Sequence, residues 1–467
     1  MICKYVFCVW ILVAHCGTAT MTQPKGCTES AVEKLYGEFP YPPRNPREEK
    51  NGLILFPKHE ETNLLRSTIF GGSDLPLPFR AAIIGGGTGD ATLALAIGLV
   101  RQGRGKNSTI LHVDLSQASI DVAKARIRKH KDFLMSSGIQ ILFLKSKISQ
   151  LPQRDLGGTF HYINCVGVLH HLPDPLSGLK ILNDLLTMQG GINIMMYARI
   201  GRTGVYHVRE MARLLSQVKP SHDIPTMKEA KSILRDSLLP TNWFMKNDIV
   251  RGSIDVRSFG DVGLSDLILN PCDIAMSITE VAQFAQNAGL RILTPVKPEL
   301  YEPTGNKDLI AQLQTLSWLE KARFAELQKG NILTHHVWMV KQENNVIATE
   351  NLPWNESSVP CCADWFPGDT GMQRKDVERG LVDGTVSYNT QIGGGENDNV
   401  VGDFTLPALG PSILLLFNCK RTLKEIYNMV KEQASWEFEW FTFLEHAEAW
   451  RKSLAKGRAI HTVYFLP

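Results

Sequence analysis

The sequence predicts an α/β fold in which a parallel sheet of seven strands is covered by helices on both faces. Three observations predict it. Between residues 80 and 198, short apolar runs alternate with longer segments of helical pattern. The runs are continuously apolar, as expected for strands that are buried on both faces. The first run leads into the turn GGGTG at residues 85–89, and such a turn joins a strand to a helix at many ligand sites.

The apolar runs and their flanking turns predict the strands in chain order. These strands are residues 80–86, 108–116, 139–146, 160–169, 192–198, 291–297 and 334–341. Apolar residues at helical spacing predict the helices between them. These helices are residues 90–103, 117–138, 174–191, 277–290 and 308–330. Residues 199–275 interrupt this order with helical sequence that contains Lys and Arg, and we expect this segment to cap a substrate site.

The ends of the chain carry different predictions. Residues 1–20 have the basic residue, apolar run and small residues of a signal peptide, whereas a start at Met21 would give a cytosolic protein, and the sequence permits both. Residues 21–75 are predicted to form an irregular, proline-rich arm, because four prolines lie between residues 40 and 46. This leaves residues 76–345 as the main domain.

Residues 346–467 are predicted to form a small α+β domain. Amphipathic patterns predict helices at 421–433 and 440–457, and the apolar end of the chain predicts a strand at 459–467. The glycine-rich segment 392–403 is predicted to be a polar loop.

Composition limits the possible functions. The chain has 467 residues, 43% of them hydrophobic, which is enough for two or three domains with real cores. Fifty basic and 47 acidic residues give a net charge of +3 without a basic stripe, so we expect no nucleic-acid partner. The leader is too short to span a membrane comfortably, so no stable membrane insertion is expected. The nine cysteines lack metal-ligand spacing, so no metal is predicted and most are expected to be small buried hydrophobes.

The glycine turn fits one class of cofactor better than another. A dinucleotide fold requires G-x-G-x-x-G, but the third glycine is replaced here by Asp90, whose negative charge would lie beside a pyrophosphate. The spacing G-x-G-x-G instead suits a cofactor with a positive sulfonium and an amino-acid tail. Asp114 ends the second strand, where a carboxylate can accept hydrogen bonds from both ribose hydroxyls.

The segment INCVGVLHHLPDP at residues 163–175 completes a resemblance to the class I S-adenosylmethionine-dependent methyltransferases. The segments YGEFPYPPRNP, MMYARIGRTGVY and SDLILNPCDIAMSITE resemble a bacterial-type group with a proline-rich N-terminal arm and a C-terminal appendage. The resemblance implies a Rossmann-like sheet of seven strands and S-adenosyl-L-methionine as cofactor. It implies methyl transfer to O, C or N of a small-molecule or peptide-like acceptor.

The resemblance also implies roles for individual residues. Those that would bind the cofactor are Gly85, Gly87, Gly89, Asp114, Leu115, Asn164 and Val166. His170 and His171 would face the methyl-transfer site, where either could act as a general base or could instead bond the backbone. Candidate substrate residues, which could equally pack or form surface ion pairs, are Tyr41, Tyr197, Arg199 and Arg202.

Three positions depart from the acids that are common in this family, namely Ile83, Lys147 and His161. They motivate an alternative, a catalytically silent protein that keeps the fold for binding or as a scaffold. A second alternative is an NAD-dependent oxidoreductase, against which we hold the charge of Asp90 and the glycine spacing.

Overall fold

A computed structural model of the chain describes residues 27–51, 62–218, 225–247, 257 and 259–348, together with short segments between 359 and 466. The predicted signal peptide and most of the helix predicted at 440–457 lie outside the described residues. None of the described helices is long and apolar enough to cross a membrane.

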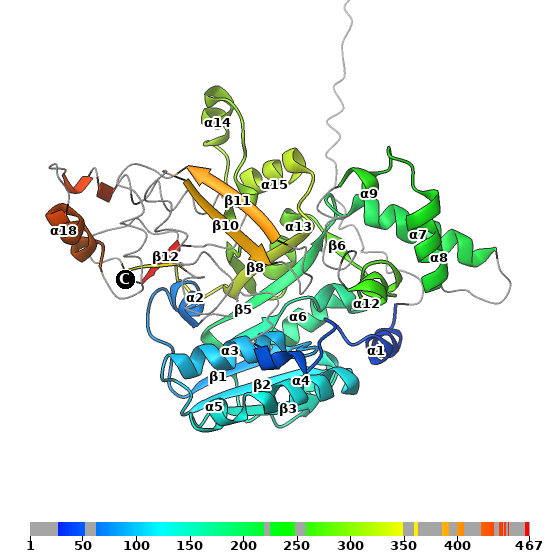
Figure 1. Ribbon diagram of the computed structural model, residues 1–467, viewed down its shortest axis with the longest axis horizontal. Coiled ribbons are helices and arrows are strands. Elements are labelled where there is room, and N and C mark those ends of the chain that lie inside the picture. Colours follow the sequence, from blue (N-terminus) through cyan, green and yellow to red (C-terminus); the bar gives the residue numbers. More distant parts are fainter. Residues whose placement is uncertain are drawn as a thin grey trace, which may run out of the picture.

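The centre of the molecule is the predicted sheet (Figure 1). Its strands are β1 (Phe79–Ile84), β2 (Ser108–Asp114), β3 (Gln140–Lys145), β4 (Phe160–Cys165), β5 (Leu186–Ala198), β7 (Leu290–Pro295) and β8 (Thr334–Lys341). They lie in the order β3-β2-β1-β4-β5-β8-β7, and a short extra strand, β6 (Ala275–Met276), pairs with β5. Strands β1 to β6 pair in parallel, whereas β8 is antiparallel to both β5 and β7. The predicted α/β fold is confirmed.

Helices bury their apolar faces against both sides of this sheet, and each side has its own core. On one side, α3 (Asp90–Arg101) contributes Leu93, Leu95 and Leu99 to a cluster that includes Trp338 of β8. On the other side, α6 (Pro175–Asp184), α13 (Ile278–Asn287) and α15 (Trp318–Lys329) cover the strands. Because β1, β4 and β5 lie between two cores, most of their residues are apolar.

Three predicted helices have other boundaries. Residues 117–138 divide near His130 into α4 (Gln117–Lys129) and α5 (Lys131–Met135). Residues 308–330 divide into α14 (Lys307–Leu313) and α15, because Ser317 begins the second helix with a capping box to Glu320. In the third, α6 ends at Asp184 and the following residues belong to β5, which pairs with both β4 and β8.

The prediction that residues 21–75 are irregular was wrong for part of the arm. Residues Glu29–Glu38 form helix α1, which begins where the Thr28 hydroxyl accepts a hydrogen bond from the amide of Ala31. A 3-10 turn, η1 (Glu48–Asn51), and helix α2 (Thr62–Ser67) follow. The prolines restrict only the segment between α1 and η1, and this segment crosses the glycine turn at the end of β1.

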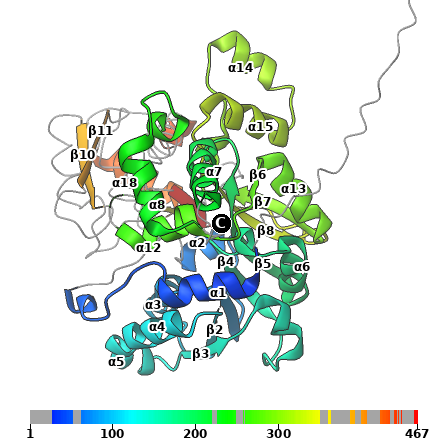
Figure 2. The same ribbon diagram turned by 90° about the vertical axis from the view of Figure 1, so that its right-hand side faces the viewer.

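The described residues between 199 and 275 form a helical lobe, which lies to the right in Figure 1 and contains α7 (Thr203–Gln217), α8 (Met227–Ser232) and α9 (Trp243–Lys246). Val205, Val208 and Ala212 of α7 pack on Phe244 of α9 in a core of the lobe's own. The lobe ends in α12 (Gly260–Leu264) and a turn of π-helix, η5 (Ser265–Leu269). Seen from the side in Figure 2, α7 and α8 lie above α1. The lobe follows the carboxyl end of β5 in the chain and lies at that end of the strands.

Beyond residue 348 the structure describes two small antiparallel pairs and one helix. Strand β9 (Val359–Cys362) pairs with β12 (Val463–Leu466), and β10 (Thr385–Gln391) pairs with β11 (Asn399–Thr405). Helix α18 (Leu423–Gln433) matches the helix predicted there. The predicted loop at 392–403 ends early, because its last residues belong to β11. That residues 346–467 form a domain of their own stays a prediction.

Candidate active site

A cavity of about 390 Å³ lies at the carboxyl ends of β1, β2 and β4, between the N-terminal arm and the helical lobe. Its floor is the glycine turn and the strand ends, and the arm contributes Val32, Tyr36 and Tyr41 to one wall. The lobe contributes Val205 and Leu267 to the opposite wall. Cavities that hold ligands in proteins measure about 300–1,000 Å³, so this one is of ordinary ligand size.

The first three glycines of the turn, at residues 85–87, line the cavity, whereas Gly89 does not. Gly85 and Gly87 have φ angles of +64° and +52°, which side chains rarely tolerate, and a Cβ on Gly85 would overlap Val168. Gly89, with φ +100°, begins helix α3 and packs against Ala123 of α4. Gly89 is predicted to bind the cofactor, but it does not line the cavity. The close packing of α3 on α4 explains why this position has no side chain.

Asp114 lies at the cavity beside the turn. Its carboxylate accepts hydrogen bonds from the amides of Gly87 and Ser116, both at 2.8 Å, and 9% of the residue is exposed. Burial raises the pKa of Asp114, although the amide hydrogen bonds oppose this rise. The side chain is thus fixed as an acceptor at the end of β2.

Three more of the predicted cofactor residues line the same cavity, namely Leu115, Asn164 and Val166. The Asn164 side chain is oriented by its neighbours, because its amide donates to the Tyr162 hydroxyl at 3.1 Å and its carbonyl accepts from the Val166 amide at 3.4 Å. The residues present fit an adenosine with an amino-acid tail. They provide bare backbone at the turn, a buried carboxylate for a diol, and an apolar side chain at Leu115.

The negative charge of Asp90 is balanced by two guanidinium groups, so this charge alone would not repel a pyrophosphate. The guanidinium of Arg44, from the arm, contacts its carboxylate at 2.7 Å, and Arg126 of α4 contacts it from the other side. The N-terminal arm opposes a dinucleotide sterically. The Thr88 amide donates to the Tyr41 carbonyl oxygen, and that oxygen occupies the space that a Cβ on Gly87 would need. The arm therefore covers the part of the turn that a pyrophosphate would approach.

The two adjacent histidines have different surroundings. His171 lines the cavity, and its Nδ1 lies 2.6 Å from the carbonyl oxygen of Cys272. His170 is fully buried behind it, stacked on Tyr197 with ring centroids 3.7 Å apart, and it does not line the cavity. Burial lowers the pKa of His171 and lowers that of His170 much further, so both rings are neutral near pH 7. Of the pair, only His171 can meet a ligand.

A carbonyl oxygen can only accept, so the neutral ring of His171 carries its proton on Nδ1. Its Nε2 then holds a lone pair, 3.4 Å from the amide nitrogen of Asn270 and 3.8 Å from a carboxylate oxygen of Asp266. An imidazole in this state can accept a proton at Nε2, and Asp266 would stabilise the resulting charge.

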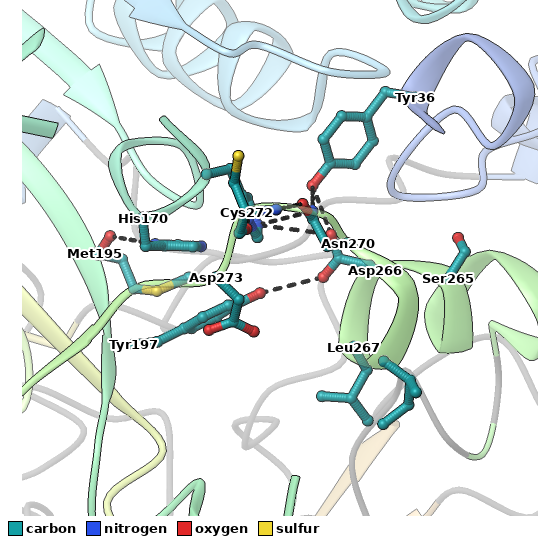
Figure 3. A network of polar contacts seen from close by, with 12 residues as sticks. Tyr36, His170, Met195, Tyr197, Ser265, Asp266, Leu267, Asn270, Cys272 and Asp273 are labelled. Atoms are coloured by element: carbon teal, nitrogen blue, oxygen red, sulfur yellow. Dashed lines mark hydrogen bonds and ion pairs between the residues drawn. The ribbon is translucent and has the colours of Figure 1, made fainter. Parts of the chain in front are cut away.

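Asp266, which sequence reasoning missed, lies in the wall of the cavity and connects Tyr36 with Tyr197 (Figure 3). One carboxylate oxygen accepts from the Tyr36 hydroxyl at 2.6 Å and the other from the Tyr197 hydroxyl at 3.2 Å. Burial and the nearby carboxylate raise the pKa of Tyr36 far above 10, so Tyr36 remains a donor. Tyr36 lies 230 residues before Asp266, and no local pattern joins the two.

The four candidate substrate residues divide into two groups. Tyr41, Tyr197 and Arg202 line the cavity, whereas Arg199 lies outside it in an exposed ion pair with Glu280. Arg202 lies over the Tyr197 ring at 3.5 Å and pairs with the buried Asp273 at 3.1 Å. Burial would raise the pKa of Asp273, but Arg202 and Arg209 bring it below its ordinary value. The charge of Arg202 is therefore already paired.

The three departures from the family pattern have structural explanations. Ile83 is buried in β1, and Lys147 pairs with Glu29 of α1 at 3.4 Å while lining the cavity. His161 stacks on Phe79 and accepts a hydrogen bond from the Arg80 amide at 3.1 Å. Despite these three departures, the cavity floor keeps Asp114 and Asn164 as polar groups.

Two of the cysteines form a disulfide, which the sequence does not predict. Cys27, just before α1, is bonded to Cys272, which follows η5. Cys165 at the end of β4 is buried and free, as expected. The sequence could not indicate the pair, because 245 residues separate its members.

Comparisons with known proteins point to methyltransferases. A family model described as "Methyltransferase domain" matches residues 83–192. An uncharacterized protein of the cyanobacterium Synechococcus is 27% identical over 234 residues, which are 49% of this chain. This chain spans only about half of that relative, 53% of its length.

Two solved structures of PKMT2 from Rickettsia typhi have the same fold. The one in complex with AdoHcy gives a TM-score of 0.57 at 17% identity, covering 87% of this chain and 74% of that protein. The other gives a TM-score of 0.58 at 17% identity, covering 88% and 77%. The agreement of sheet order, glycine turn, Asp114 and these comparisons leads to one conclusion. Residues 83–192 match a family model of methyltransferase domains, and the chain has the Rossmann-like fold of methyltransferases.

Proposed function

We propose that this protein is an S-adenosylmethionine-dependent methyltransferase that acts on a small or peptide-like acceptor. The observation that carries the proposal is the cavity itself. It joins a glycine turn of positive φ and a buried carboxylate at one end to His171 and Asp266 at the other. When bound, S-adenosylmethionine supplies an activated methyl group on a sulfonium and leaves as S-adenosylhomocysteine.

The protein's own residues bind and orient. Asp114 would accept hydrogen bonds from the ribose hydroxyls, Leu115 would contact the adenine, and Gly85 would let the amino-acid tail lie against the backbone, while Gly87 holds Asp114. Asn164 and Val166 would line the floor beside the sulfonium. Because methyl transfer is an in-line displacement, alignment of the two reactants by these walls supplies much of the rate enhancement.

His171 is the proposed general base. A neutral imidazole can take up at Nε2 the proton that a hydroxyl, a carbon acid or an ammonium loses on methylation, in exchange for the long hydrogen bond of 3.4 Å that Nε2 accepts from the Asn270 amide. Asp266 lies 3.8 Å from that nitrogen and would stabilise the imidazolium. His170 has no such role, since its ring lies behind Tyr197 and His171.

The walls at this end restrict the acceptor. Polar groups of Tyr36, Asp266 and His171 lie beside the apolar side chains of Val205, Leu267 and Leu333. Arg202 is already paired with Asp273, so Asp266 is the charge available to an acceptor. This arrangement favours an acceptor that has an apolar body and a neutral or cationic polar head, and it disfavours a carboxylate or phosphate acceptor.

Titration calorimetry with S-adenosylhomocysteine tests the cofactor assignment. Asp114→Asn keeps the shape of the side chain but removes its charge, and each charge-assisted hydrogen bond to a hydroxyl is worth about 1.5–3 kcal/mol. We therefore expect the affinity to fall by about 10- to 100-fold. Asp121→Asn, on the exposed side of α4, is the matched control and should bind as the parent does. Equal affinity in all three proteins, or binding of NAD(H) instead, would contradict the proposal.

Turnover separates the enzyme from a silent binding protein. Incubation with methyl-tritiated S-adenosylmethionine and a fractionated cell extract should label an acceptor. His171→Gln should lower the rate of labelling about 100-fold or more without changing the affinity for S-adenosylhomocysteine. Binding of the cofactor without any labelled product would favour the binding protein.

A further inference from the structure

The Cys27–Cys272 disulfide joins the two walls of the cavity. Cys27 precedes helix α1 of the arm, and Cys272 lies in the segment between η5 and β6 of the lobe. Both residues are buried, and they pack with Val32 and Tyr36 of α1 and with Leu115. The bond therefore lies beside the cavity and connects segments that are remote in sequence.

The backbone of Cys272 positions two side chains of the acceptor side. Its carbonyl oxygen, 2.6 Å from Nδ1 of His171, determines which nitrogen of that ring carries the proton. Its amide donates to the side-chain oxygen of Asn270 at 3.2 Å, which turns the Asn270 amide nitrogen toward the Tyr36 hydroxyl and Nε2 of His171. Figure 3 shows Cys272 and Asn270 at the centre of this network, with Tyr36 reaching in from α1.

The two halves of the arm are held differently. Helix α1 is held by ion pairs of partly exposed side chains, Glu29 with Lys147 and Glu33 with Lys145, by three hydrogen bonds of Tyr36, and by the disulfide. Residues 44–51 are instead held by the buried pairs of Arg44 and Glu49 with Asp90 and Arg126. Exposed ion pairs contribute little, so α1 is held mainly by the disulfide, the hydrogen bonds of Tyr36 and the packing of Val32, and the last two lie beside the disulfide.

We propose that the Cys27–Cys272 disulfide is a positioning element of the acceptor side, so that the site is complete only in the oxidised protein. This rests on the proposed function. Two electrons and two protons from a dithiol reductant convert the bond to two thiols, while the reductant forms its own disulfide. Helix α1 then loosens and withdraws Tyr36 from Asp266, and the Cys272 carbonyl no longer fixes His171. Residues 44–51 stay in place.

Hydrogen exchange measured by mass spectrometry tests the release of α1. In the full-length protein, reduction should raise the exchange rates of the 29–38 amides about tenfold or more and leave those of 44–51 unchanged. The double variant Cys27→Ser, Cys272→Ser is the matched control and should show the reduced pattern with or without reductant. Unchanged exchange in α1 overturns the proposal, and so does an equal rise in both halves of the arm.

Nitrogen-15 NMR of the histidine rings tests positioning separately from packing. The His171 signal, identified by its loss in His171→Gln, should report a proton on Nδ1 in the oxidised protein and a mixture of tautomers after reduction. A single tautomer in both states overturns the positioning role, even if α1 loosens. Binding of S-adenosylhomocysteine should weaken about tenfold on reduction, because Val32 and Tyr36 line the cavity. Failure to bind it in either state would reject the proposed function, whereas exchange and NMR would still decide this proposal.

Discussion

Replacing Arg126 by Met should lower the free energy of unfolding by about 3–5 kcal/mol, because it removes the main partner of the buried Glu49 and one of the two guanidinium partners of the buried Asp90. The Arg126 side chain is fully buried, and those of Glu49 and Asp90 are 1% and 4% exposed. Arg126 also donates to the Thr88 carbonyl oxygen at 2.8 Å. One guanidinium thus joins the arm, helix α4 and the glycine turn.

The magnitude follows from what remains after the change. Asp90 keeps its ion pair with Arg44 at 2.7 Å, but Glu49 keeps only His130 at 3.3 Å. Removal of one partner from a buried ion pair costs about 3–5 kcal/mol, since the other charge stays buried. Met fills most of the space of the aliphatic stem, so little of the loss comes from a cavity. Because Glu49 can take up a proton, we expect the lower half of this range near pH 6.

Urea unfolding followed by circular dichroism measures this loss. Arg128→Met, two residues along the same helix, is the matched control, since Arg128 is exposed. It should change the free energy of unfolding by less than about 0.5 kcal/mol. A loss below about 1 kcal/mol in Arg126→Met would refute the reasoning, because the network would then contribute no more than a surface ion pair.

Three further outcomes are expected from the same measurement. Asp273→Asn should cost about 3–5 kcal/mol because Arg202 is left buried without its partner, whereas Asp261→Asn, in a half-exposed pair with Lys231, should cost at most about 1 kcal/mol. Ser277→Ala should cost about 1 kcal/mol because it removes the capping box at the start of α13. The pKa of Glu49 is lowered in the folded protein, since Arg126 and His130 outweigh its burial. Its contribution is therefore present above the unfolded value of about 4.3, is lost as the pH falls through the folded value, and should shrink in Arg126→Met, as the pH dependence of unfolding will show. The first prediction is contradicted if the Asp273 and Asp261 variants are equally stable. The second is contradicted if Ser277→Ala is as stable as the parent, and the third if stability does not change across acid pH.

The N-terminal arm shows where prediction from the sequence fails. The prolines at 40–46 predict an irregular arm over residues 21–75, yet Thr28 caps a helix that carries Tyr36 to the cavity. The capping residue and the helix-forming residues can be recognised in the local sequence. What could not be seen was the surface against which this short helix packs, and a helix of ten residues depends on such packing.

The site was predicted in the same uneven way. Gly85, Gly87, Asp114, Asn164 and His171 line the cavity, because each lies at the carboxyl end of a parallel strand, and these ends meet at one edge of the sheet. Residues outside that pattern were harder to predict. Gly89, His170 and Arg199 lie near the right elements, but the geometry of a helix start, a 3-10 turn and a surface loop turns them away from the cavity.

The sequence by itself determined the sheet, the turn and the carboxylate at the end of β2. Each depends on periodicity and spacing within some 30 residues, which strand and helix geometry convert directly into position. Only the tertiary structure decided the acceptor side. Asp266, Tyr36, Asn270 and the Cys27–Cys272 bond come together across more than 200 residues. Contacts of that range are set by how the arm and the lobe pack on the sheet, and no local pattern in the chain records that packing.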